Sequence, residues 1–324
     1  MMLDSLSYKT KQFFVVLIKL SIVVGAFYFI YLKLTENETL DFRVFIDFLI
    51  KKEGFSLKNI LLLLFLSVFN WFFEILKWHT LVSSITKISF KNALEQSLGA
   101  LTASLFTPNR IGEYGAKAIY YLSGLRKKVM LLNLISNILQ MSVTVVFGSI
   151  GLLFFVSHYH LEIDFKKILY ALTLILMIGA FFVFSLQHKA FEIKGFSIKK
   201  IIEFIKSINK TIILKAALFS ILRYLIFSFQ MYYLLLVFGV DISYINAMMV
   251  ITTMYLLSSI IPSIFIFDVV IKGGVAVYLF SIIGINELTV LCIITLMWML
   301  NFVLPSVFGS YYVLNFNLPK EQTE

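Results

Sequence analysis

Long apolar runs, separated by short charged or polar segments, set the pattern of this chain. Five runs are long enough to cross a bilayer, since a spanning helix needs about 20 apolar residues. They are residues 13–32, 129–156, 168–186, 212–238 and 288–312. A sixth run, 59–76, is shorter and bounded by charge, and we interpret it as a further spanning helix. Continuous runs favour helices over a barrel, whose strands would alternate over about 10 residues.

Two regions between these runs, 93–122 and 246–284, mix apolar residues with prolines, glycines and charges. Basic residues precede and follow 93–122, and cytoplasmic loops attract such residues. We therefore expect 93–122 to enter and leave on the cytoplasmic face as a re-entrant helical hairpin, and 246–284 to do the same from outside. The alternative is that each region is a pair of short spanning helices, for which the flanking charges would be the same.

The predicted fold is an all-α polytopic membrane bundle with two oppositely oriented re-entrant hairpins, arranged like an inverted repeat. Residues 1–324 form a single membrane domain in this interpretation. Its parts are an N-terminal spanning helix plus an interfacial helix in 1–58, a first half in 59–156 and a second half in 168–312. Within 187–211, isoleucines at helical spacing among lysines indicate a basic interfacial helix, or alternatively a solvated linker helix.

Composition agrees with this pattern and changes how the charge is interpreted. Hydrophobic residues make up 60% of the chain and charged residues 14%, whereas soluble domains carry about 25% charged residues. The formal net charge of +10 would suggest nucleic acid in a soluble protein. Here the basic residues gather in loops, as the positive-inside rule requires, so we expect no nucleic-acid partner. We expect a multi-pass protein of the cell membrane with both termini in the cytoplasm.

Cysteine and histidine usage bounds the chemistry. The single cysteine, Cys292, excludes disulfide frameworks and cysteine metal sites. The four histidines lie near helix ends without a carboxylate–histidine motif, which favours interfacial placement over metal ligation. We expect neither a metal nor a cofactor.

The stretch FTPNRIGEYGAKA (residues 106–118) interrupts the apolar pattern most sharply. A helix from about 109 to 122 would begin with free N–H groups, and an arginine in its first turn would add a planar fork of donors, which together suit an anion. Charges at membrane depth are costly unless paired or wet, so they favour a functional interpretation. The candidate anion-binding residues here are Thr107, Pro108, Asn109, Arg110, Gly112, Glu113 and Lys117.

A second stretch, IPSIFIFDVVIKGGVA (261–276), repeats the order of proline, acid and lysine four residues after the acid. Its candidate binding residues are Pro262, Asp268, Lys272 and Gly273. An ion pair that only holds two helices together is the alternative for both stretches. Glu74 and Arg223, on the runs 59–76 and 212–238, are added as candidates because each shares a helix face with further polar residues: Asn70 and Lys77 for Glu74, and Gln230 for Arg223. Lys77 is also assigned, with Lys87 and Lys91, to the cytoplasmic segment that follows residue 76. The polar stripe Asn133, Asn137, Gln140 and Thr144 favours hydrogen bonds between helices over ligand contact.

The motif TPNRIGEYGAKA resembles the Thr-Pro-Gly-Arg-x-Gly-Glu signature of the lysylphosphatidylglycerol synthase transmembrane family, with Asn109 in place of the glycine. The stretch 261–276 matches a second family motif only loosely. The resemblance implies a membrane domain that binds or translocates a lipid, either an aminoacylated phospholipid or a polyprenyl-phosphate carrier. Aminoacyl-transferring members carry a large soluble domain after the membrane part, and we expect this chain, which ends at Glu324, to lack that catalysis.

The leading functional hypothesis is therefore a transporter or flippase for an anionic lipid. A second hypothesis is an intramembrane enzyme acting on a lipid headgroup, with Glu113, Asp268 and Glu74 as acid or base. The spanning runs show none of the usual His–acid, Ser–His or metal-ligand spacings. A third is an accessory subunit of an envelope lipid or glycolipid synthase, which would add an envelope-biosynthesis partner to the membrane lipids. The oligomeric state is left open.

Overall fold

The computed structural model describes residues 56–105, 107, 111–159, 198–260 and 268–318, with a few positions between 17 and 31. Every regular element in these ranges is a helix, which confirms the predicted all-α class. In chain order they are α3 (Leu57–Val82), α4 (Phe90–Ser104), α5 (Gly112–Ala118), α6 (Ser123–His158), α8 (Ile198–Ser207), α9 (Lys210–Val237), α10 (Tyr244–Ile260), α11 (Asp268–Ile282), α12 (Glu287–Trp298), the π-helix η2 (Met299–Val303) and α13 (Leu304–Leu314). The predicted span 168–186 and the interfacial helix before residue 56 lie outside the described residues.

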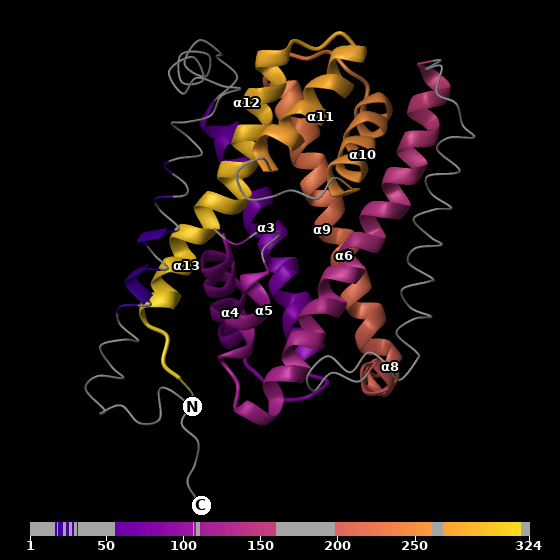
Figure 1. The fold of residues 1–324 in the computed structure, drawn as a ribbon. Coiled ribbons are helices and arrows are strands. Elements are labelled where there is room, and N and C mark those ends of the chain that lie inside the picture. The colour runs from indigo at the N-terminus through magenta and orange to yellow at the C-terminus, as the bar shows by residue number, and fades with distance from the viewer. Residues whose placement is uncertain are drawn as a thin grey trace, which may run out of the picture.

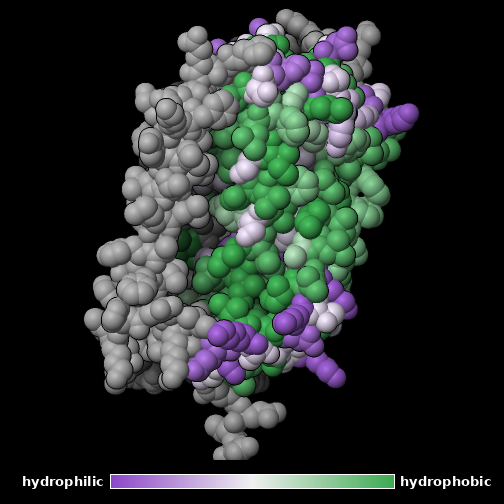
Figure 2. Space-filling view, turned by 90° about the vertical axis from the view of Figure 1, so that its right-hand side faces the viewer, coloured by the Kyte–Doolittle hydropathy of each residue, from purple (hydrophilic) through white to green (hydrophobic). Residues whose placement is uncertain are grey.

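Four of these units are long and apolar enough to cross a membrane: α3, α6, α9 and the continuous stretch α12–η2–α13. The space-filling view shows a broad hydrophobic band between hydrophilic residues at both ends of the molecule (Figure 2). Bulky apolar side chains point outward all along these helices, for example Phe65 on α3 and Phe154 on α6. A soluble protein would bury such a band, so the chain is a multi-pass membrane protein.

Two helix boundaries differ from the expected ones. We predicted that a cytoplasmic segment starting with Lys77 would follow residue 76, but α3 continues to Val82 and buries that lysine. Glu74, one turn earlier, pairs with it and removes the reason for the helix to end. The run predicted over 129–156 is also longer in the structure, because α6 already begins at Ser123.

The two interrupted regions each form a pair of short helices. α4 has 15 residues and α5 has 7, while α10 has 17 and α11 has 15. At 1.5 Å per residue each is too short to cross about 30 Å of hydrocarbon alone. α4 and α5 lie in the lower half of Figure 1, and α10 and α11 lie in the upper half. The re-entrant character of these pairs stays a prediction.

Each pair of short helices packs against a long helix from the other half of the chain. α4 packs along α13, α10 packs along α6, and α3 packs along α9 (Figure 1). The contacts of both short pairs run over glycines, since a Cβ at Gly151 of α6 would overlap Thr252 of α10, and one at Gly309 of α13 would overlap Leu98 and Thr102 of α4. Small residues of this kind allow helix backbones in a membrane to approach closely.

The helix α12–η2–α13 contains a π-turn that its apolar run did not predict. Leu304 donates its N–H to the Met299 carbonyl, five residues back. In an uninterrupted α-helix the Asn301 carbonyl would accept from residue 305, which is a proline without an N–H. The indole Nε1 of Trp71 on α3 donates to that carbonyl at 2.9 Å instead. The freed backbone group is thus satisfied by a neighbouring helix, as membrane interiors require.

Candidate polar site between α3, α5, α6 and α9

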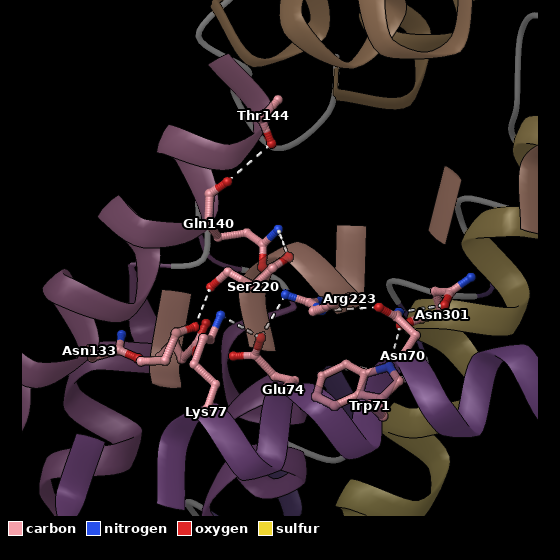
Figure 3. Close-up of polar contacts among 12 residues, drawn as sticks. Asn70, Trp71, Glu74, Lys77, Asn133, Gln140, Thr144, Ser220, Arg223 and Asn301 are labelled. Carbon is pink, nitrogen blue, oxygen red and sulfur yellow. Dashed lines mark hydrogen bonds and ion pairs between the residues drawn. The ribbon is translucent and has the colours of Figure 1, made fainter. Parts of the chain in front are cut away.

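The site is built around one carboxylate, Glu74 on α3. Its Oε2 lies 2.7 Å from Nζ of Lys77, one turn further along the same helix. The same oxygen lies 2.7 Å from Nη1 of Arg223 on α9. Figure 3 shows the two cations approaching the carboxylate from different sides. The exposed fractions of the side chains are 1% for Lys77, 9% for Glu74 and 19% for Arg223, so the arginine is the open member of this cluster.

A chain of amides holds Arg223 on one side. Its Nε donates to Oδ1 of Asn70 at 3.1 Å, and Nδ2 of Asn70 donates to Oδ1 of Asn301 at 2.7 Å. Asn301 donates in turn to Gln230, which donates to the Ser67 hydroxyl. These donors and acceptors join α3, α9 and η2 into a satisfied network (Figure 3). A connected network of this kind stabilises the fold and fixes the arginine on this side.

The opposite side, formed by α6, is different. Asn133, Ser136 and Gln140 follow one another at helical spacing on one face. Within the described residues, Nδ2 of Asn133, Oγ of Ser136 and Oε1 of Gln140 are buried without a hydrogen-bond partner. This face borders the charged cluster, because Nε2 of Gln140 donates to the carbonyl of Ser220, three residues before Arg223 on α9. Buried groups of this kind usually have a partner, so this face is suited to a polar ligand.

α5 adds a second ion pair, and the predicted pairing of Glu113 with Lys117 is confirmed. Nζ of Lys117 lies 2.7 Å from Oε1 of Glu113 and donates to Oδ1 of Asn133 on α6 at 2.9 Å. It also lies 4.2 Å from the ring centroid of Trp78 on α3, a cation–π contact. With its side chain 1% exposed, this lysine holds α5 against α3 and α6. Lys117 also acts electrostatically on Glu74, so the two ion pairs form one charged cluster.

A buried glutamine fixes the turn that follows α5. Oε1 of Gln96 on α4 accepts from the Trp78 indole at 2.8 Å and from the Tyr121 hydroxyl at 2.7 Å. Burial raises the pKa of Tyr121 to about 12, so its hydroxyl stays protonated and remains a donor at neutral pH. These bonds connect α4, α3 and the turn before α6, and they position the lower part of the cluster.

The predicted site residues are only partly brought together. Glu74, Arg223, Glu113 and Lys117 belong to the cluster. The Thr107 hydroxyl accepts the N–H of Gly112 at 3.0 Å, but the N-cap of α5 is Ile111 and not Thr107. The helix after it, predicted over 109–122, is shorter and spans only Gly112–Ala118. Gly273 is buried in α11, which belongs to the other pair of short helices. Residues 108–110, Pro262 and the side chains of Asp268 and Lys272 lie outside the described part of the chain.

Several residues of the site were not among the candidates. Lys77 shares a face with Glu74, and that spacing could have identified it. Asn301 lies four residues before Pro305, so the proline was a signal that its carbonyl needs an outside donor. The polar stripe on α6 makes the predicted bonds between helices, because Asn137 donates to the Tyr114 hydroxyl and Gln140 to the Ser220 carbonyl. Ser136 carries no signal beyond its spacing from Asn133 and Gln140.

The charged groups of the cluster are unequal in number. Its charged members among the described residues are three cations and two carboxylates: Lys77, Lys117, Arg223, Glu74 and Glu113. Across the same residues, no group of three histidine, cysteine, aspartate or glutamate side chains is placed to hold a metal ion. A surplus of buried positive charge beside unpartnered hydrogen-bonding groups favours a ligand with negative charge.

A family model described as the lysylphosphatidylglycerol synthase TM region matches residues 16–309. The match includes α3 to α12, and with them all five charged members of the cluster. No curated protein and no solved structure matches the chain.

Proposed function

This chain belongs to the lysylphosphatidylglycerol synthase transmembrane family, and we propose that it binds an anionic lipid and moves it between the two membrane leaflets. The observation that carries the proposal is Arg223, the open cation of an otherwise buried cluster. A guanidinium has five N–H donors, of which Nε donates to Asn70 and Nη1 to Glu74. The remaining donors form a planar edge that suits a phosphate.

The unpartnered groups on α6 support the same function. Asn133, Ser136 and Gln140 follow one another along one helix face beside the charged cluster. A charged headgroup that leaves water needs such partners in place of its hydration shell. The acyl chains would stay in the hydrocarbon outside the bundle, where α6 exposes apolar residues such as Val146 and Leu153.

The packing of each helix pair against the other half supports movement between leaflets. In transporters built from inverted repeats, a site between the halves opens alternately to the two sides as one half rocks against the other. Here each pair of short helices rests on the last helix of the other half, α4 on α13 and α10 on α6. A change in these two glycine-lined contacts would open one end of the site while it closes the other.

The charge distribution supports an orientation. The lower end of the bundle in Figure 1, where α3 ends and α6 and α9 begin, carries the exposed side chains of Lys91, Lys127, Lys128, Lys206 and Lys210. By the positive-inside rule this end faces the cytoplasm in our proposal. Its lysines would also attract anionic headgroups of the inner leaflet toward the site.

The proposal is tested with the purified protein reconstituted into phosphatidylcholine vesicles that contain a fluorescent phosphate-bearing lipid. Chemical quenching of the outer leaflet then reports the rate of exchange between leaflets. We expect the protein to accelerate exchange, and Arg223→Gln to reduce this acceleration at least tenfold. Lys215→Gln is the matched control, because it removes one positive charge from an exposed position on the same helix. The proposal fails if the protein accelerates no phosphate-bearing lipid, or if both variants behave like the parent.

A further inference from the structure

Lys77 is a buried cation of the cluster that shares its carboxylate with a second cation. Its side chain is 1% exposed, and Oε2 of Glu74 at 2.7 Å is the one partner that the described residues give it. That oxygen also accepts from Nη1 of Arg223 at 2.7 Å. Two buried cations thus share one negative charge. Lys117, by contrast, has the carboxylate of Glu113 within 2.7 Å.

The charged groups that act on Lys77 come from three elements. Glu74 lies on its own helix, Arg223 on α9 and Lys117 on α5. α4, α6 and η2 also pack against α3, but in the described residues they contribute no charged group that acts on this amine. Lys77 therefore has one attractive and two repulsive charged neighbours, and the attractive one is already bound to an arginine.

Only one of the two cations that share Glu74 can lose its charge. An arginine stays protonated in proteins, whereas a lysine readily gives up its proton when it is buried. Removal from water penalises the ammonium form, and a shared carboxylate compensates for this only in part. The empty cluster thus disfavours the ammonium form of Lys77 relative to a lysine in water, so a fraction of the protein carries the neutral amine, hydrogen-bonded to Glu74.

We propose that an anion binding at Arg223 is accompanied by the uptake of one proton at Lys77. The inference rests on the proposed function, since it concerns the same anion site. The anion supplies the second negative charge that the two cations lack, and the lone pair of Nζ takes a proton from water to form the ammonium. No covalent bond to carbon changes, and the proton leaves again when the anion is released. In a membrane with a pH difference, this coupling drives the anion together with protons toward the less acidic side.

The test counts protons during binding. Dihexyl phosphate is a suitable probe, because a phosphate diester keeps a single charge near neutral pH. Its binding to the full-length protein in detergent is measured calorimetrically near pH 7.5 in two buffers that differ in ionisation enthalpy. We expect a measurable fractional uptake of protons per bound phosphate, equal to the share of protein whose Lys77 is neutral before binding, since linkage ties binding to protonation. Lys77→Met removes the titrating amine and leaves Glu74 paired with Arg223, so binding should persist with almost no proton uptake.

Two further variants complete the test. Lys77→Arg carries a fixed charge and should also bind without proton uptake, and it serves if Lys77→Met does not fold. Lys215→Gln should take up protons like the parent, because it is exposed on α9 and is not part of the cluster. Binding without proton uptake in the parent would overturn the inference and leave the proposed function intact. Undiminished uptake in the Lys77 variants would overturn it as well, and no phosphate binding by the parent would overturn both proposals.

Discussion

The carboxylate of Glu74 and the guanidinium of Arg223 lie 149 positions apart in the sequence and 2.7 Å apart in the structure. This contact joins α3 to α9, one long helix from each half of the chain. On one side the arginine is held by Asn70, and its side chain remains the most exposed of the charged cluster. An arginine that is fixed on one side and partly exposed keeps donors with which it can bind a further partner.

The first prediction concerns the carboxylate itself. Glu74→Gln removes the negative charge that Lys77 and Arg223 share and leaves both cations inside the protein. Breaking a buried ion pair in this way costs about 3–5 kcal/mol, so we expect a marked loss of thermal stability in detergent. The double variant Glu74→Gln with Lys77→Met also removes one stranded cation and should regain part of that loss. Equal stability of parent and Glu74→Gln would show that the carboxylate does not compensate these cations.

The sequence predicted which residues share a helix face in this site better than it predicted which helices pack against one another. Helical spacing correctly assigned Glu74 and Lys77 to one face, and Glu113 and Lys117 to one ion pair. Spacing along one helix cannot show which other helix meets that face, so the bond from Glu74 to Arg223 was not predictable. The early end assigned to α3 had a related cause, because Lys77 was treated as a water-facing charge when its partner lay one turn away. The π-turn in η2 was missed because the apolar run continues through Pro305 and gives no local sign of the indole that satisfies Asn301.

The second prediction concerns the α4–α5 pair. If the pair enters and leaves on the cytoplasmic face, single cysteines at Lys91 and Lys127 should both react with an impermeant maleimide from the cytoplasmic side. A cysteine at Asp241 should react only from outside. All three positions are exposed, whereas the native Cys292 is fully buried and should give little background. Reaction of the first two positions from opposite sides would mean that the region crosses the membrane once, which neither a re-entrant hairpin nor a pair of spanning helices allows.

The third prediction uses the glycine contact between α6 and α10. A Cβ at Gly151 would overlap the Thr252 side chain, so Gly151→Ala should separate the helices and destabilise the protein by about 1–3 kcal/mol. Gly115 of α5 has open space around its Cβ position. Gly115→Ala should therefore be neutral or stabilising by up to about 1 kcal/mol, because alanine favours a helix more than glycine does. Thermal unfolding in detergent should show a loss of stability for Gly151→Ala and none for Gly115→Ala, and a Gly151→Ala variant as stable as the parent would contradict the close packing at Gly151.

The last prediction concerns the bond from Trp71 to the Asn301 carbonyl. Trp71→Phe keeps an aromatic ring but removes the donor, so a buried carbonyl loses its partner at a cost of about 1–3 kcal/mol. Pro305→Ala restores an N–H at the position that an α-helix would use for the same carbonyl. If the proline is the reason for the bond, Trp71→Phe should cost clearly less in the Pro305→Ala background than in the parent. A double-mutant cycle on thermal unfolding measures this difference. Loss of ring packing costs the same in both backgrounds, so any difference between them reports the hydrogen bond. Additive effects of the two substitutions would instead mean that the indole acts through packing alone, including its contact with the Arg223 guanidinium 5.9 Å from the ring centroid.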